Sequence, residues 1–140
     1  MWLYNGKEWK APTEFSSDDY YGFVYLITNE QTDQKYIGKK FFWFKKTLPI
    51  TKSRKRRKRL LVESDWKDYF GSNRLLNEEI TDKGNTHFKR EILHLCKSRG
   101  ECAYMEAKEQ FDRDVLLTDE YYNGIIACKI GAPSVKNLKK

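Results

Sequence analysis

Two strand-like runs near the start of the chain, separated by a polar segment, form its clearest pattern. The runs cover residues 22–28 and 35–40, and the six residues between them are all polar. Such a pair of runs predicts a β-hairpin. Because side chains alternate across a strand, the first strand should have two distinct faces. We expect one face to carry Val24 and Leu26, and the other to carry Phe23, Tyr25 and Ile27.

A helix and a third strand should follow the hairpin. Residues 74–82 predict a helix that is capped by Ser72 or Asn73 and ends near Gly84. Residues 87–96 have the pattern of a strand.

Two further helices are marked by their first residues. Ser64 should cap a short helix over residues 65–69. Ser98 and Glu101 have the spacing of a capping box, so a helix should open there and run to about Asp114.

Three segments leave alternatives open. The aromatic run 41–44 is either a buried extension of the strand or the start of a helix. The segment 47–63, whose residues 52–59 include seven lysines and arginines, is either a projecting hairpin with a basic tip or a disordered loop. Residues 121–126 suggest a final turn followed by a short strand or helix.

The order hairpin, helix, strand, helix predicts an α+β fold: a small three-stranded antiparallel sheet flanked by helices. We expect one domain over residues 20–126, with the basic insertion at about 47–63. An arm over residues 1–19 should pack back on it through Trp2 and Trp9, and a tail over residues 127–140 should fray.

The charge of the chain favours a polyanionic partner. The net charge is +7 and the isoelectric point is about 9.2, which favours nucleic acid first and an acidic membrane surface second. No apolar run reaches membrane-spanning length and no signal-peptide core is seen, so we expect a cytoplasmic protein in a bacterial or phage-infected cell. Three cysteines without metal-like spacing predict reduced thiols and no zinc site.

The hairpin also carries two short motifs. Tyr36-Ile37-Gly38 follows Phe23-Val24-Tyr25, and the two tyrosines are eleven positions apart. This arrangement resembles the signature of the GIY-YIG endonuclease family, with the second motif literal and the glycine of the first replaced. The resemblance covers roughly residues 20–124 and is strongest to small phage and mobile-element members, which include homing endonucleases.

The resemblance implies an endonuclease that hydrolyses DNA phosphodiester bonds with Mg²⁺ or Mn²⁺. It implies Tyr25 as general base, Tyr36 as a second hydroxyl that holds the water or phosphate, and Glu106 as the metal ligand. Glu109 is the rival ligand, one helical turn further on. Asn123 would orient the metal-bound carboxylate or contact phosphate. Without the resemblance, these residues are ordinary core aromatics, helix-surface glutamates and a turn asparagine.

The chain also departs from the family at an arginine position. The family places an arginine about ten residues after the second tyrosine, where this chain has Lys45 and Lys46. Either Lys46 substitutes, or an arginine of the inserted segment (Arg54, Arg56 or Arg57) reaches the site, or the site is weaker.

The DNA contacts are expected from basic residues near the hairpin and in the insertion. The candidates are Lys39, Lys40, Lys45, Arg54, Lys55, Arg56, Arg57, Lys58 and Arg59. Trp66, Tyr69 and Phe70 could stack on an unpaired base, with core packing favoured for Trp66. The alternatives to a nuclease are a non-catalytic nucleic-acid-binding module and, less favoured, an RNA-associated basic protein. A monomer should nick DNA, and a homodimer could cut both strands.

Overall fold

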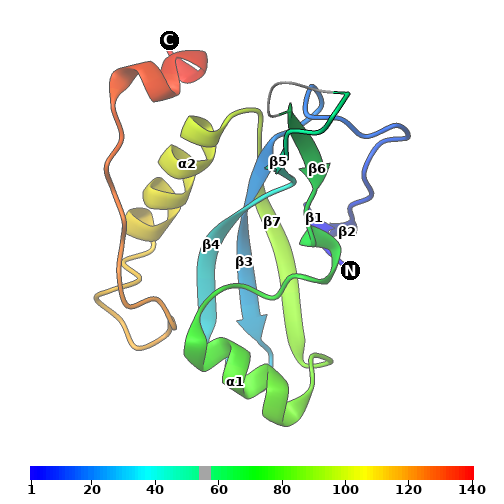
Figure 1. The fold of residues 1–140 in the computed structure, drawn as a ribbon. Coiled ribbons are helices and arrows are strands. Elements are labelled where there is room, and N and C mark those ends of the chain that lie inside the picture. The colour runs from blue at the N-terminus through cyan, green and yellow to red at the C-terminus, as the bar shows by residue number, and fades with distance from the viewer. Residues whose placement is uncertain (54–57) are drawn as a thin grey trace.

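The computed structural model describes residues 1–53 and 58–140, with the backbone alone for Lys58 and Arg59. Its elements in chain order are β1 (Leu3–Tyr4), β2 (Lys7–Glu8), β3 (Gly22–Asn29), β4 (Lys35–Phe41), β5 (Trp43–Leu48), β6 (Lys58–Glu63), the 3₁₀ helix η1 (Trp66–Asp68), α1 (Arg74–Lys83), β7 (Phe88–Cys96), α2 (Arg99–Asp112) and the 3₁₀ helix η2 (Ala132–Leu138) (Figure 1).

The main sheet has five strands in the order β2-β1-β7-β3-β4. Strand β3 pairs antiparallel with both β4 and β7, which form the predicted three-stranded core. The prediction of a purely antiparallel three-stranded sheet is wrong, because the arm adds β1, which runs parallel to β7, and β2. Trp2 anchors this addition: it is buried, and its indole N–H donates to the Trp66 carbonyl at 2.8 Å.

The two predicted faces of β3 are confirmed. Phe23, Tyr25 and Ile27 belong to an aromatic cluster that also contains Trp2 of the arm and, from the segment after β4, Phe42. Val24 and Leu26 belong to a second cluster with Ile37, Cys96, Cys102 and Val115. This second face is covered by α2, while α1 lies across one end of the sheet (Figure 1). Because both faces are covered, β3 is buried along almost its whole length.

Local side-chain bonds explain where the helices begin. Asn73 caps α1 by accepting from the Leu76 amide, and Ser98 caps α2 by accepting from the Glu101 amide. The prediction that Ser64 caps a helix is wrong. Its hydroxyl donates to the Phe41 carbonyl at 2.7 Å, and η1 begins without a side-chain cap.

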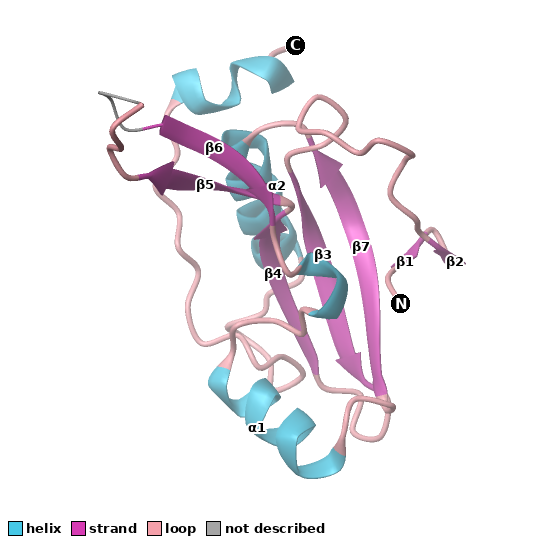
Figure 2. Cartoon of the chain, turned by 45° about the vertical axis from the view of Figure 1, so that its right-hand side comes forward, coloured by secondary structure: helices cyan, strands magenta, loops and turns pink. Residues whose placement is uncertain are grey.

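The basic insertion forms a separate two-stranded sheet. Phe42 lies buried between β4 and β5, so the aromatic run 41–44 continues as strand rather than helix. Strands β5 and β6 pair antiparallel from Trp43 opposite Glu63 to Leu48 opposite Lys58, and they project from the main sheet (Figure 2). The hairpin alternative therefore holds for the described arms of the insertion. Arg54, Lys55, Arg56 and Arg57 lie outside the described residues.

The end of the chain differs from its prediction. Tyr121 makes a single parallel bridge with Lys35, and no strand or helix follows until η2. Residues 132–138 form η2, which packs on α2, and the Asn137 amide donates to Glu101 at 2.9 Å. In the described part of the chain, no helix is long and apolar enough to cross a membrane.

Candidate active site

An open cavity of about 560 Å³ lies beside strand β4. Its lining residues come from both sheets, from α2 and from the segments before and after η1: Tyr25, Tyr36, Lys39, Lys40, Phe41, Trp43, Phe44, Ser64, Asp65, Ser72 and Glu106. The two tyrosines and the glutamate singled out in the sequence therefore converge on one concave site, together with two lysines.

The cavity wraps around the edge of the main sheet. Strand β4 is the edge strand, and its residues alternate between the two faces. Tyr36 and Lys40 face the aromatic cluster that contains Tyr25, while Lys39 faces α2 and Glu106. Groups from opposite faces of the sheet thus meet at the edge, where Gly38 has no side chain between them.

Gly38 makes room for the tyrosine pair. A Cβ atom at this position would lie 2.4 Å from the Tyr25 hydroxyl oxygen and 3.0 Å from a ring carbon of Tyr36. The two rings lie against each other, with centroids 6.1 Å apart. The glycine of the second motif is therefore required by side-chain packing inside the site.

The two hydroxyls differ in their surroundings. Tyr25 has no exposed surface, and its buried hydroxyl has no hydrogen-bond partner among the described residues. The Tyr36 hydroxyl is 3.4 Å from the Ser72 hydroxyl. Burial, followed by the neighbouring Tyr69 and Tyr36, raises the pKa of Tyr25 well above its ordinary value. Burial also raises the pKa of Tyr36, although the bond to Ser72 opposes this.

The lysines do not offset this effect, because each is paired with a carboxylate. Lys39 Nζ lies 3.1 Å from Glu106 Oε1, and Lys40 Nζ lies 2.7 Å from Asp65 Oδ1. Lys40 also sits over the Tyr69 ring, 4.1 Å from its centroid.

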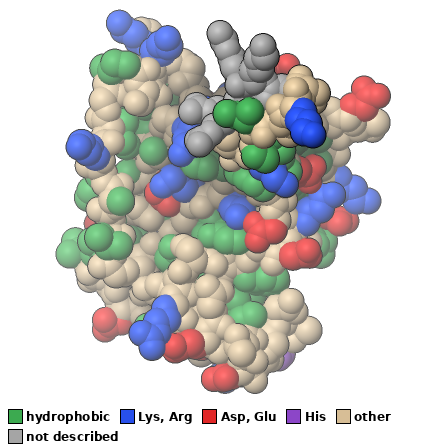
Figure 3. All heavy atoms as spheres, viewed as in Figure 1, with side chains coloured by type: hydrophobic (Ala, Val, Ile, Leu, Met, Phe, Trp, Pro, Cys, Tyr) green, Lys and Arg blue, Asp and Glu red, His purple; other side chains and the backbone are tan. Residues whose placement is uncertain are grey.

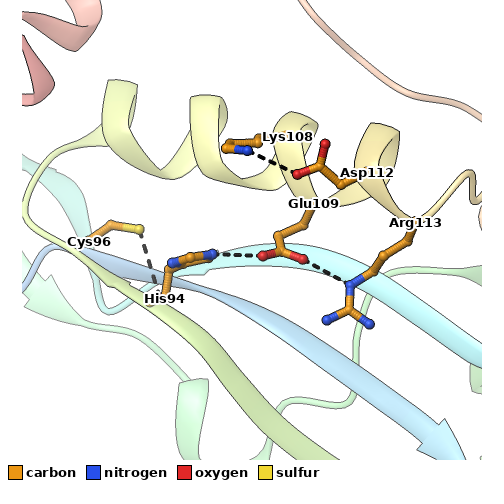
Figure 4. A network of polar contacts seen from close by, with 6 residues as sticks. All are labelled: His94, Cys96, Lys108, Glu109, Asp112 and Arg113. Carbon is orange, nitrogen blue, oxygen red and sulfur yellow. Dashed lines mark hydrogen bonds and ion pairs between the residues drawn. The ribbon is translucent and has the colours of Figure 1, made fainter.

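The structure distinguishes the two candidate glutamates. Glu106 lines the cavity with 12% of its side chain exposed. Glu109 instead bonds His94 and Arg113, each at 2.9 Å, between α2 and the sheet (Figure 4). Both carboxylate oxygens of Glu109 are thus engaged away from the cavity, which leaves Glu106 as the candidate ligand.

The donors at the cavity fit a metal ion that keeps much of its own water. Within residues 1–53 and 58–140, no group of three or more His, Cys, Asp or Glu side chains could hold a metal. A closed zinc or calcium site needs such a group. A single carboxylate such as Glu106 suits Mg²⁺, which is commonly held by one or two carboxylates together with waters and substrate phosphates.

Asn123 is buried and bonds the backbone of the edge strand β4. Its amide accepts from the Ile37 N–H at 3.0 Å and donates to the Ile37 carbonyl at 2.8 Å. Gln110 donates to the same carbonyl at 3.1 Å. The contact of Asn123 with phosphate or with the metal-bound carboxylate stays a prediction, and in this structure the amide bonds the backbone of Ile37. Asn123 thus pairs the backbone N–H and carbonyl of Ile37 at the edge of β4. These bonds help to hold the neighbouring Tyr36 and Gly38 in position.

Lys46 also lies away from the cavity. It is exposed on β5 opposite Leu60, and Lys45 is exposed opposite Leu61. The proposed catalytic substitution by Lys46 is therefore not supported. The buried Arg90 cannot substitute either, because it stacks on Trp2 and Phe70 and donates to two backbone carbonyls. Among the described residues, the cations that line the cavity are Lys39 and Lys40.

Asp65 and Phe44 line the cavity although no local pattern in the sequence marks them as site residues. The pairing of Trp43 with Glu63 returns the chain to β4, and the Ser64 amide donates to the Phe42 carbonyl at 2.7 Å. This return places Asp65 beside Lys40. Their place at the cavity depends on the register of the second hairpin, which only the structure shows.

Removing the Tyr25 hydroxyl should not destabilise the fold. Tyr25→Phe deletes a buried group that has no partner, so the free energy of unfolding should stay the same or rise by up to about 1 kcal/mol. The matched control is Tyr122→Phe, because that buried hydroxyl bonds Glu79 and Asn29. It should cost about 1–3 kcal/mol. Thermal melts of both variants measure the difference, and a clear loss in Tyr25→Phe would reveal a partner for its hydroxyl.

Comparison with known proteins gives one match. A family model described as "Putative endonuclease segE, GIY-YIG domain" matches residues 2–126. This range includes every cavity-lining residue and also the arm that forms β1 and β2. No curated protein and no solved structure matches the chain.

Proposed function

The chain belongs to the GIY-YIG endonuclease domain family, and on this basis we propose that it is a divalent-metal-dependent endonuclease that hydrolyses phosphodiester bonds in DNA. The supporting observation is the convergence of Tyr25, Tyr36 and Glu106 with two lysines in one cavity at the edge of the sheet. These groups provide hydroxyls for proton transfer, a carboxylate for a metal and positive charge for a phosphate.

In this proposal Tyr25, ionised to its phenolate, accepts the proton of the attacking water, and Tyr36 and Ser72 orient that water or the phosphate. Both phenols are held by packing, with Tyr25 between Trp2, Phe23 and Tyr69. Mg²⁺ or Mn²⁺ held by Glu106 would stabilise the charge developing on the phosphate and would lower the pKa of the nearby phenols.

Lys39 and Lys40 supply the positive charge that the family obtains from an arginine. Lys39 now neutralises Glu106, so it becomes available to a phosphate when Glu106 binds a cation. Lys40 is held by Asp65, whose side chain is 74% exposed. A lysine contributes a point charge without the bidentate geometry of arginine. Lys45 and Lys46 lie further out, on the projecting hairpin, where they would contact flanking phosphates.

Incubation with supercoiled plasmid tests this function. We expect nicked circles to accumulate with Mg²⁺ or Mn²⁺ and none in excess chelator, because the negative charge of Glu106 opposes that of the reacting phosphate unless a divalent cation offsets both. One active site cuts one strand at a time, so a monomer should give nicked circles first. Simultaneous formation of linear DNA would indicate a dimer. Equal cleavage with and without chelator would contradict the metal-dependent mechanism.

A non-catalytic DNA-binding module is the second candidate. The observation that favours it is the cavity itself, in which both described cations are paired with carboxylates and no described arginine is present. Such a protein would shift DNA in a gel while leaving the plasmid intact at every metal concentration. Cleavage that appears with metal excludes it.

A further inference from the structure

Phe44 differs from the other aromatic residues of the cavity. Tyr25, Tyr36, Phe41 and Trp43 each contact another ring. Phe44 lines the same cavity, is 48% exposed and contacts no ring or cation among the described residues. A large apolar ring exposed on the wall of a polar, charged cavity contributes little to the core and is available to a ligand.

The hairpin presents Phe44 next to positive charge. Residues that share a face of β5 are two positions apart, so Phe44 and Lys46 lie on the same face, about 7 Å apart along the strand. Lys45 and its partner Leu61 lie on the opposite face. Figure 3 shows hydrophobic side chains exposed among lysines and arginines around this hairpin. An aromatic ring beside cations is complementary to a nucleobase and its phosphates.

We propose that Phe44 stacks on a nucleobase beside the scissile phosphate, and that the preferred substrate is DNA in which this base is unpaired or easily unstacked. The proposal rests on the proposed nuclease function and identifies its substrate class. Apolar side chains that insert between bases must overcome the cost of unstacking, which is smallest where the pairing is already broken. Stacking of a base on an aromatic ring contributes about 1–3 kcal/mol.

Binding measurements in excess chelator, where no cleavage occurs, test the stacking directly. Three short duplexes of the same sequence are compared: one fully paired, one with a single mismatch, and one with an abasic site at the same position. The abasic duplex is as deformable as the mismatch but has no base to stack. The protein should bind the mismatched duplex about 5- to 150-fold more tightly than the abasic one, from the stacking energy above.

Phe44→Ala should bind the mismatched and abasic duplexes equally, and Phe44→Trp should restore the difference. Leu61→Ala is the matched control, because Leu61 is 46% exposed on the opposite face of the same hairpin. It should leave the difference unchanged. Equal behaviour of Phe44→Ala and the unmodified protein, or the same loss in Leu61→Ala, would overturn the proposal. A change in oligomeric state in Phe44→Ala without a change in preference would also overturn it, and would assign this face to a protein contact.

These binding measurements, taken together with the plasmid assay in metal, separate this proposal from the nuclease function. If metal-dependent cleavage is absent but the mismatch preference depends on Phe44, the stacking contact stands and the nuclease function fails. If cleavage is present and Phe44→Ala keeps the preference, the nuclease function stands and the stacking contact fails.

Discussion

Glu106→Gln should reduce Mg²⁺-dependent cleavage by at least about 10²-fold, because it removes the carboxylate charge from the cavity while preserving the shape of the side chain. DNA binding in chelator should persist or strengthen, since one negative charge is lost and Lys39 is released from its 3.1 Å ion pair. Rates from plasmid nicking and affinities from salt-matched titrations measure the two effects separately.

Glu109→Gln is the matched control, because it changes the same residue type one helical turn away. Glu109 bonds His94 and Arg113 rather than the cavity. We expect it to retain most of the cleavage rate but to melt at a lower temperature, because two partly buried contacts are weakened.

Metal binding gives a readout that does not depend on cleavage. A ligand that binds only the folded state raises its stability according to the ligand concentration and dissociation constant. Mn²⁺ should therefore raise the melting temperature of the unmodified protein and of Glu109→Gln but not that of Glu106→Gln. The reverse pattern would assign the metal to Glu109 and contradict the placement proposed above.

The sequence predicted the parts of the fold that show a clear alternation of apolar residues or a helix-capping residue. The alternation in β3 identified both of its faces, and Asn73 and Ser98 identified the starts of α1 and α2. The sequence did not predict that the arm forms strands β1 and β2. Each strand has only two residues, and so short a segment shows no periodicity. Their place in the sheet depends on long-range contacts such as the bond from Trp2 to Trp66.

The candidate site was predicted where it depends on the first hairpin and missed where it depends on distant pairing. Tyr25 and Tyr36 meet because they lie on paired strands. Asp65 meets Lys40 only through the return of the second hairpin, which local patterns do not encode. The bonds between Asn123 and the backbone of Ile37 were missed for the same reason, because the two residues lie far apart in the sequence.

Gly38→Ala should abolish cleavage and destabilise the fold by about 1–3 kcal/mol, the usual cost of overpacking. The new methyl group would lie 2.4 Å from the Tyr25 hydroxyl oxygen and 2.6 Å from the adjoining ring carbon, too close for any side chain. Tyr25 cannot retreat, because it has no exposed surface and its ring packs on Trp2 and Phe23. Thermal melts and plasmid nicking measure the two losses.

Gly124→Ala is the control for this prediction, because a Cβ atom there would meet nothing within 4 Å. It should change the stability by less than about 0.5 kcal/mol. Combining Gly38→Ala with Tyr25→Phe removes the nearest clashing atom, so the pair should be less destabilised than the sum of the two single changes. Additive effects would mean that the methyl group strains the β4 backbone instead. Coupled effects would mean that the glycine is needed at this position to leave room for the Tyr25 phenol. The methyl group and the hydroxyl would then compete for the same space beside the cavity.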